Sequence, residues 1–451
     1  MFDPSRRAER DTLKSALKRL AVHLEREEMN LGLRNRARKE KDQRKFRLAV
    51  EVIGCNLLMA KWLANDAKDN PGPPVELYRS LSIIRKADPS RPEVYGQAFL
   101  DALDLMSHPK IGLASQTQGH RIEGRAGQPS TISPRPALWD HLPLDDFHPR
   151  DLRREIEEGL IILNAPKSRS KRGVSRDAPE RLPLPDIRRI KPMRNAIKRL
   201  NDNLRRADIA LVEAEGGGPR FGMDRDGRPL DPTQRLLKRH FNNGSLEQGG
   251  RLFGGFWQHL GRADRLQRLR IDGERVADVD YGQLYLRLCY VVEGASQPAG
   301  DLYAIDGLEG HREGIKKLVN AMLFAEKPLT RWPRDTASLF PEGTKVADVR
   351  ERVLARHPAI AHRFGTGFGF RLMLIESEML IDLLRALFNI GITALPIHDA
   401  VMVAVPHAET AKEAMLETFS HFDGFRDADP DISRGLVKIE YPADYCGFEA
   451  L

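Results

Sequence analysis

Two aspartates, Asp280 and Asp399, lie in sequence contexts that suit a metal-binding acid. Asp280 closes a short apolar strand and precedes apolar residues at helical spacing, which predicts a strand-to-helix junction. Asp399 belongs to a His-Asp tip between two apolar runs, which predicts a β-hairpin with the acid at its turn. Two carboxylates, with the main-chain carbonyl of Tyr281 beside them, are the oxygen ligands that Mg²⁺ prefers. Each acid alone also has an ordinary explanation, a helix cap for Asp280 and a solvated turn for Asp399.

The segment 312–325, between the two acids, has the pattern of a helix with two cations on one face. Four of its residues recur every four positions and share that face: Arg312, Lys316, Asn320 and Phe324. Lys316 and Phe324 would lie about 12 Å apart along the axis, the scale of a nucleotide from its phosphates to its base. We expect Arg312 and Lys316 to bind a triphosphate and Phe324 to stack near a base. A surface helix with scattered charges is the alternative.

A glycine-rich segment, 248–260, precedes both features and contains Arg251, Gln258 and several aromatic residues. Glycines let the backbone approach a ligand closely, here a nucleic-acid strand. The spacing of the glycines matches neither a P-loop nor a dinucleotide fingerprint. Paired acids, a cationic helix and this segment together suggest two-metal nucleotidyl transfer.

Composition favours a folded protein with a polyanionic partner. The chain has 451 residues, 41% of them hydrophobic and 30% charged, with a formal net charge of +8 and a pI near 9.3. No apolar run approaches the roughly 20 residues that span a bilayer, so we expect no membrane partner. Three scattered cysteines, Cys55, Cys289 and Cys446, form no zinc or disulfide spacing. We therefore expect a cytoplasmic protein, associated with the nucleoid in a bacterium.

Two segments are strongly basic. Residues 34–47 are dominated by Lys and Arg, and a solvated helix face and a phosphate-contacting face explain them equally well. Residues 165–194 hold ten Lys/Arg against three Asp/Glu among several prolines, which predicts an exposed basic arm for phosphate backbones.

With these segments taken together, the chain resembles the polymerase domain of family A DNA polymerases and, more distantly, the single-subunit phage RNA polymerases. The stretch from Asp280 to Arg287 is similar to their motif A, and His398-Asp399 is similar to motif C. Arg312, Lys316 and Phe324-Ala325 are similar to motif B, and Gly250-Arg251-Leu252 with Gln258 is similar to a segment that contacts the primer-template. The likeness covers about residues 235–451.

The resemblance implies a role for each matching residue. Asp280 and Asp399, with the carbonyl of Tyr281, would hold two Mg²⁺ ions, with Mn²⁺ as an alternative. Lys316 would bind the triphosphate with Arg312 and donate a proton to pyrophosphate. The remaining assignments follow the same motifs: Asn320, Phe324, Gln283 and Tyr285 at the incoming nucleotide, and Arg251, Gln258 and His398 at the primer and template.

The resemblance also implies an α+β right-hand polymerase with an antiparallel palm sheet, helical fingers and a helical N-terminal thumb-like region. We expect four regions along the chain. Residues 1–106 form a helical basic region, and residues 107–192 form a loop-rich basic linker region that includes a short helix near 151–163. Residues 193–250 form thumb-like connecting helices, and residues 251–451 form a palm with fingers inserted at about 301–375. Residues 107–136 in particular read as a loop or linker.

Several positions depart from the family pattern. Tyr285 stands where DNA polymerases carry the Glu that excludes a ribose 2′-hydroxyl, Phe324 replaces its Tyr partner, and Ala400 replaces a second motif C acid. Asp280 and Asp399 are only 119 positions apart, which implies reduced fingers. No Asp-x-Glu sequence of the proofreading exonuclease type precedes Gly250.

We therefore expect a compact DNA polymerase without proofreading, which extends a DNA primer on a template from nucleoside triphosphates. The departures leave open an RNA polymerase or primase, with RNA among its partners, and a degenerate palm that only binds nucleic acid. A polymerase of this size suits a phage, plasmid or integrated element by analogy.

Overall fold

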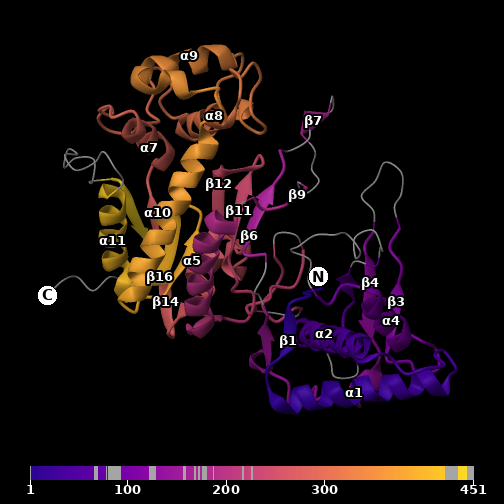
Figure 1. Ribbon diagram of the computed structural model, residues 1–451. Coiled ribbons are helices and arrows are strands. Elements are labelled where there is room, and N and C mark those ends of the chain that lie inside the picture. The colour runs from indigo at the N-terminus through magenta and orange to yellow at the C-terminus, as the bar shows by residue number, and fades with distance from the viewer. Residues whose placement is uncertain are drawn as a thin grey trace. The chain divides into compact units, whose positions relative to one another are not determined.

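A computed structural model describes residues 2–65, 70–77, 79, 93–120, 128–155, 159–166, 169–170, 173–174, 180–185, 187–215, 218–224, 227–421 and 435–443. The chain divides into two units (Figure 1). The first comprises residues 1–159 and 211–234, and the second comprises residues 160–210 and 235–451. The predicted boundaries at 192 and 250 fall inside a helix and a strand of the second unit. No helix in the described parts of the chain combines the length and the apolar character needed to cross a membrane.

The first unit is built around one buried helix. Its helices are α1 (Asp11–Asn30), α2 (Glu40–Ala64) and α4 (Gln97–Met106), and its strands are β1 (Arg6–Ala8), β2 (Val75–Leu77), β3 (Ala114–Thr117), β4 (Ser130–Pro134) and β5 (Leu152–Arg154). Residues 52–59 of α2 are buried on every side of the helix, including Cys55, because α1 and α4 both pack against it. Cys55 and, in the second unit, Cys289 are free and buried, while Cys446 lies outside the described residues.

Three arginines of the basic segment 34–47 pair with acids of α1. Arg38 forms a two-point ion pair with Glu28 of α1, and the Nε of Arg47 donates a hydrogen bond of 3.0 Å to Glu25. Arg34 also pairs with Glu28. These arginines are committed to α1, which favours a structural role over the phosphate-contacting one.

Two sequence-based predictions, for residues 107–136 and 151–163, are wrong. Residues 107–136 contain β3 and β4, which with β2 form an antiparallel sheet in the order β2-β4-β3, in place of a plain loop. Around 151–163 the described residues form β5 and the start of β6 instead of a short helix. These strands are short and carry little apolar alternation, so pairing across the sequence decides them more than local propensity.

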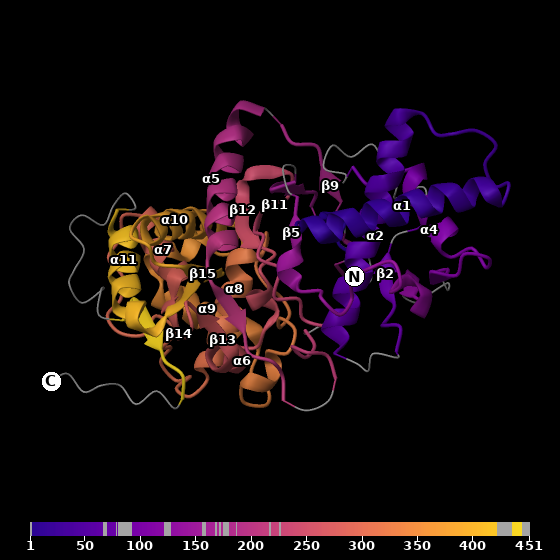
Figure 2. The same ribbon diagram turned by 90° about the horizontal axis from the view of Figure 1, so that it is seen from below.

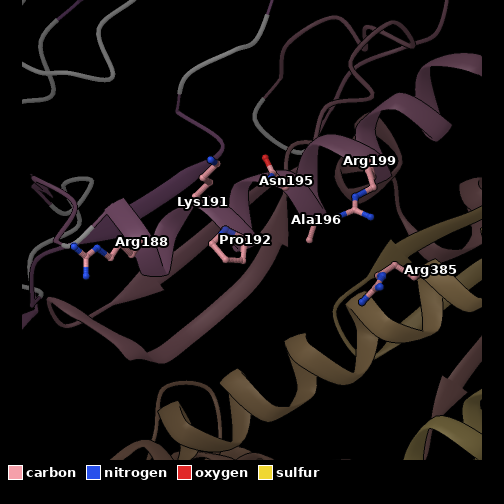
Figure 3. A pocket seen from close by; sticks show the side chains of 7 residues that line it. All are labelled: Arg188, Lys191, Pro192, Asn195, Ala196, Arg199 and Arg385. Atoms are coloured by element: carbon pink, nitrogen blue, oxygen red, sulfur yellow. The ribbon is translucent and has the colours of Figure 1, made fainter.

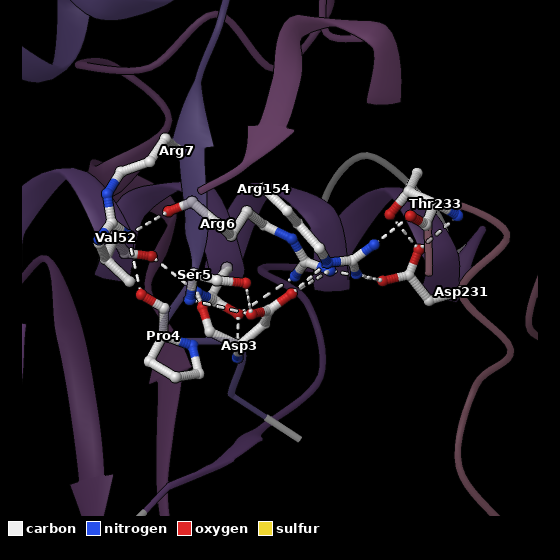
Figure 4. A network of polar contacts seen from close by, with 10 residues as sticks. Asp3, Pro4, Ser5, Arg6, Arg7, Val52, Arg154, Asp231 and Thr233 are labelled. Atoms are coloured by element: carbon white, nitrogen blue, oxygen red, sulfur yellow. Dashed lines mark hydrogen bonds and ion pairs between the residues drawn. The ribbon is translucent and has the colours of Figure 1, made fainter. Parts of the chain in front are cut away.

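An ion-pair network fixes the N-terminus to the end of the first unit (Figure 4). The guanidinium of Arg154 contacts the carboxylates of Asp3 and Asp231 and the carbonyl of Thr233, and Arg6 also pairs with Asp231. Burial favours protonation of Asp3 and Asp231, but the arginines outweigh burial and hold both pKa values below the ordinary carboxyl value.

The second unit is a mixed α and β structure. Its helices are α5 (Ile187–Arg206), α6 (Arg262–Arg268), α7 (Leu284–Val292), α8 (Arg312–Phe324), α9 (Val346–Arg356), α10 (Gly369–Asn389) and α11 (Ala408–Ser420). Its strands are β6 (Ile161–Asn164), β7 (Arg169–Ser170), β8 (Gly173–Val174), β9 (Arg181–Leu182), β10 (Ile209–Leu211), β11 (Lys238–Asn242), β12 (Ser245–Phe253), β13 (Leu269–Ile271), β14 (Glu274–Tyr281), β15 (Ala394–Ile397), β16 (Ala400–Ala404) and β17 (Val437–Glu440).

One sheet of this unit has β14 in its interior. The strand order is β10-β13-β14-β16-β15, and β17 pairs with β14 as well. Both β16 and β17 run antiparallel to β14, with Asp280 opposite Ala400 on one side and Lys438 on the other. The strands of this sheet are largely apolar and buried, and α6 and α11 pack against β14. The chain is thus an α+β protein with largely antiparallel sheets, which confirms the predicted class at that level.

A second sheet, in the order β12-β11-β6-β9, packs against the long helix α10. Its β11 and β6 are parallel, and the other pairs are antiparallel. Helix α5 packs against β6 (Figure 1), and Figure 2 shows it next to β12 of the same sheet. Helices α7, α8 and α9 gather at one end of α10 (Figure 1).

The basic arm predicted at 165–194 is not a plain extended segment: its described residues include the short strands β7, β8 and β9, and from Ile187 onward it is α5. The sequence places the start of this helix at Met193, six residues too late. Pro192 suggests a break, yet it lies within the second turn of α5, where the fold accommodates it.

Candidate active site

The register of one strand pair brings the two aspartates together. Asp280 is opposite Ala400 in the β14–β16 pairing, and the main-chain N–H of Tyr281 donates a 3.3 Å hydrogen bond to the carbonyl of Asp399. Asp399 and His398 form the two-residue turn of the β15–β16 hairpin, where His398 takes a left-handed φ of 55°. The predicted strand end and the predicted hairpin turn are both confirmed, and they are adjacent.

The environment of the two carboxylates disfavours their negative charges. Burial, the neighbouring Asp399 and Asp278 raise the pKa of Asp280 to about 8. Burial also raises the pKa of Asp399, although Arg251 and Lys316 act in the opposite direction. The Asp280 carboxylate accepts no hydrogen bond and forms no ion pair within the described residues. A bound cation would offset the unfavourable negative charges of these two acids.

A divalent cation fits the chemistry of this pair. It would compensate the repulsion that raises the pKa of Asp280, and both ligands are hard oxygens. Among the described residues no group of three or more His, Cys, Asp or Glu side chains could hold a metal ion. A cation here would therefore complete its coordination with main-chain, water or substrate oxygens. Tyr281 offers only its carbonyl, because its hydroxyl donates a 2.6 Å hydrogen bond to Met415 in α11.

The predicted cationic helix is α8, and its Lys316 is close enough to act electrostatically on both acids. The positive charge of Lys316 acts to lower the pKa of both Asp280 and Asp399, and burial outweighs this effect. It is exposed, and it forms no hydrogen bond or ion pair with the described residues. Its charge is consequently available to an anionic ligand beside the carboxylates. Arg312 is less available, because its Nε donates to Asp301 and its guanidinium lies over the ring of Tyr303.

At the other end of α8, Phe324 belongs to an aromatic cluster. Its ring centroid is 5.1 Å from that of Phe370 and 5.7 Å from that of Tyr285. Asn320, one turn earlier, is partly exposed. The aromatic wall and the exposed Lys316 thus lie at opposite ends of one helix face, as the spacing predicts.

Arg251 is bound to Tyr285 and Glu376 in a closed triad. Its Nε and Nη2 donate to the two carboxylate oxygens of Glu376 at 2.9 and 2.8 Å, and Nη2 also donates to the Tyr285 hydroxyl at 2.6 Å. The Tyr285 hydroxyl and Glu376 are themselves hydrogen-bonded. Burial opposes the charge on Arg251, but Glu376 outweighs burial and raises its pKa. The triad fixes the Tyr285 ring against Phe324.

Two residues predicted to contact substrates are engaged in structural hydrogen bonds: Gln258, expected at the primer and template, and Gln283, expected at the incoming nucleotide. The side-chain oxygen of Gln258 accepts from the N–H of Gly254, and its nitrogen donates to the carbonyls of Leu252 and Pro396. Gln283 precedes α7, and its side-chain oxygen accepts from the N–H of Leu302. His398 is exposed, with its ring 5.9 Å from that of Phe253. Of these three, His398 is the one placed at an accessible surface beside the acids.

Two residues of the site were not identified from the sequence. Glu376 is a carboxylate within an apolar run of α10, and its side chain is 1% exposed. An acid on the buried face of a helix is a signal in itself, because its burial requires a partner. Asp278 shares its side of β14 with Asp280, two residues away. Its Oδ2 accepts from Arg262, whereas its Oδ1 is buried without a hydrogen-bond partner within the described structure.

The site therefore comprises two neighbouring acidic residues, a lysine that acts on both, and an arginine triad that adjoins an aromatic cluster. Comparison of the chain with protein-family models and with curated proteins found no match. The likeness to polymerase motifs consequently rests on the residues of this chain and on their arrangement in the second unit.

Proposed function

We propose that this protein is a template-directed nucleotidyltransferase, a compact DNA polymerase of the family A type without a proofreading exonuclease. The observation that carries the proposal is the adjacency of Asp280 and Asp399, held by the β14–β16 register, with Lys316 acting on both. Binding of nucleic acid alone requires no paired carboxylates with raised pKa values. Two-metal phosphoryl transfer uses paired carboxylates to hold its ions, because the reaction needs positioned charge more than covalent chemistry.

In the proposed reaction the primer 3′-oxygen attacks the α-phosphorus of a nucleoside triphosphate, and the bond to the β-phosphate oxygen breaks to release pyrophosphate. Asp280 and Asp399 would hold Mg²⁺ or Mn²⁺, which supplies Lewis-acid activation of the hydroxyl and neutralises charge on the phosphates. Lys316 would bind the triphosphate and donate a proton to the leaving pyrophosphate. Arg312 would assist once a phosphate replaces Asp301 as its partner.

The elements around the site are consistent with a right-hand polymerase arrangement. In this proposal the sheet containing β14, β16 and β17 serves as the palm, and α8 and α9 serve as the fingers. The helical first unit serves as the thumb-like region. Arg251 and His398 would contact the primer end, and Phe324 and Tyr285 would contact the nascent base pair and sugar.

Primer extension with matched acid variants tests the proposal. We expect Asp280→Asn and Asp399→Asn each to lower the extension rate at least about 10³-fold with Mg²⁺ or Mn²⁺. Duplex affinity should stay within about threefold, because these acids carry no attraction for phosphates. Asp272→Asn is the control, since Asp272 is an exposed acid with φ of 53° in the β13–β14 turn, a conformation that Asn tolerates.

If the wild-type protein extends no primer with either nucleotide set or either ion, yet binds duplex, the enzymatic proposal is wrong and a nucleic-acid-binding role remains. Equal losses of affinity and activity in the two Asn variants would instead assign the acids a structural role.

Tyr285 gives a reason to keep an RNA polymerase or primase as a second candidate. Its ring is bound by Arg251 and Glu376 and lies against Phe324, so any exclusion of a 2′-hydroxyl here depends on the bulk of the rings. Extension assays with ribonucleotides and deoxyribonucleotides in parallel distinguish the two. For the DNA polymerase, Tyr285→Ala should raise ribonucleotide use relative to deoxyribonucleotides by about tenfold, and Tyr285→Phe should leave the ratio nearly unchanged.

A further inference from the structure

The second unit carries a cationic groove between α5 and α10 (Figure 3). Its volume is about 650 Å³, and its polar lining consists of Arg188, Lys191, Asn195 and Arg199 from α5 and Arg385 from α10. Figure 3 shows Arg199 and Arg385 reaching toward the groove from the two facing helices. None of these residues belongs to the candidate active site.

Helix α5 has two chemically distinct faces. Ile190, Ile197, Leu200 and Leu204 are buried, and they hold the helix against the rest of the unit. The helix contains eight Lys/Arg against a single Asp, and its groove-lining cations are exposed. The like charges on this face repel one another, and a bound anion would reduce that repulsion.

Three cations of the groove, Lys191, Arg199 and Arg385, can bind a ligand. Lys191 and Arg199 form no hydrogen bond or ion pair with the described residues. Arg385 pairs with Asp382 at 3.2 Å, but both side chains are more than half exposed. An exposed pair of this kind contributes little to stability, so a phosphate can replace Asp382 as the partner of Arg385.

The shape of the groove selects among anions. Arg188, Lys191 and Arg199 follow one stripe of α5 and extend over about 16 Å. A single phosphate needs donors that converge on one point, whereas a strand of nucleic acid presents phosphates at regular intervals over such a distance. The two other lining residues, Pro192 and Ala196, are small, and no aromatic side chain lines the groove. The groove therefore offers no stacking platform for unpaired bases.

We propose that the α5–α10 groove binds the phosphate backbone of a nucleic-acid duplex, independently of base sequence and outside the candidate active site. The proposal goes beyond the catalytic one and does not depend on it, because binding is measurable without nucleotides or metal ions.

The test compares two triple variants of equal charge. The groove variant carries Lys191→Gln, Arg199→Gln and Arg385→Gln, and the control carries Lys198→Gln, Arg205→Gln and Arg206→Gln. The control positions are exposed on the same helix but do not line the groove. Fluorescence anisotropy with a blunt 20-base-pair DNA duplex gives the affinity across a salt series, and thermal unfolding verifies folding.

The groove variant should bind about tenfold more weakly near 0.1 M salt, and its plot of log K against log salt should be shallower by about 2 to 3. The control should stay within about twofold of wild type. The single variant Arg385→Gln, on α10, should bind the duplex more weakly than wild type. This variant tests the proposal if the triple variant does not fold.

Three outcomes would overturn the proposal. Unchanged affinity in the groove variant would show that the duplex binds elsewhere. Equal losses in both triple variants would show an effect of net charge alone. Displacement of the duplex by polyglutamate at equal charge concentration would show a site for acidic peptides. A failure of primer extension with groove binding intact would reject the catalytic proposal alone.

Discussion

Arg251 and Glu376, 125 residues apart, form a two-point ion pair in which Nε and Nη2 of the guanidinium lie 2.9 and 2.8 Å from the two carboxylate oxygens. The Glu376 side chain is 1% exposed and that of Arg251 is 22% exposed. The pair joins β12 to α10 beside the candidate active site, and its arginine also holds Tyr285. It therefore determines the position of groups on both sides of the site.

Replacement of Glu376 should destabilise the protein. Glu376→Ala leaves the guanidinium of Arg251 partly buried without its anion, and we expect a loss of about 2–4 kcal/mol in the free energy of unfolding. Glu378→Ala is the matched control, since Glu378 is 45% exposed and lies 3.8 Å from Arg239, and it should cost less than about 1 kcal/mol. Urea unfolding measures both. Equal small losses would mean that the triad does not hold α10 to β12.

Lys316 and Lys317 should differ sharply in function although they are neighbours on α8. Lys316 acts electrostatically on both aspartates, whereas Lys317 lies 3.9 Å from Glu313 on the same helix. Lys316→Ala should lower kcat/KM for nucleotide addition about 100-fold, and Lys317→Ala should change it less than about threefold. Steady-state extension kinetics give both values. Similar losses in the two variants would argue against a role for Lys316 at the phosphates.

The stability of the metal-free protein should depend on pH through Asp280. Its folded pKa is raised to about 8 from an ordinary value of 3.8. The folded protein therefore binds the Asp280 proton more tightly than the unfolded chain does. The resulting gain in the free energy of unfolding is fully present below pH 3.8 and is lost as the pH rises through about 8. Thermal unfolding in EDTA should show this loss, and Asp280→Asn should reduce it. Added Mg²⁺ should restore stability above pH 8 in the wild type but not in the variant.

The opposite pH dependence is expected in the first unit. The pKa values of Asp3 and Asp231 are lowered, so the stability from their ion pairs is present above the ordinary value of 3.8 and is lost as the pH falls below it. Arg154→Met should cost about 3–5 kcal/mol at neutral pH, because two buried carboxylates lose their shared partner. Arg153→Met, at a neighbouring position 43% exposed, should cost under about 1 kcal/mol. Acid titration of unfolding by circular dichroism tests both statements.

The local parts of the site follow from the sequence alone. The strand that ends at Asp280, the His398-Asp399 hairpin and the helix with Lys316 and Phe324 on one face are all found as predicted. Each is encoded by apolar periodicity or turn chemistry within about ten residues, and such short-range patterns largely survive whatever the rest of the chain does. Short strands such as β3 and β5 lack a periodic signal and were missed.

The tertiary structure decided which of these pieces meet. The β14–β16 register places Asp280 beside Asp399, and a slip of one residue would turn Asp280 to the opposite face of the sheet. Glu376 reaches Arg251 across 125 residues, and Arg385 joins the α5 cations from a distant helix. No local pattern encodes such encounters, because burial and packing over the whole unit select them. The sequence by itself determined the chemistry of the residues and their local elements, and the packing determined which of them act on one another.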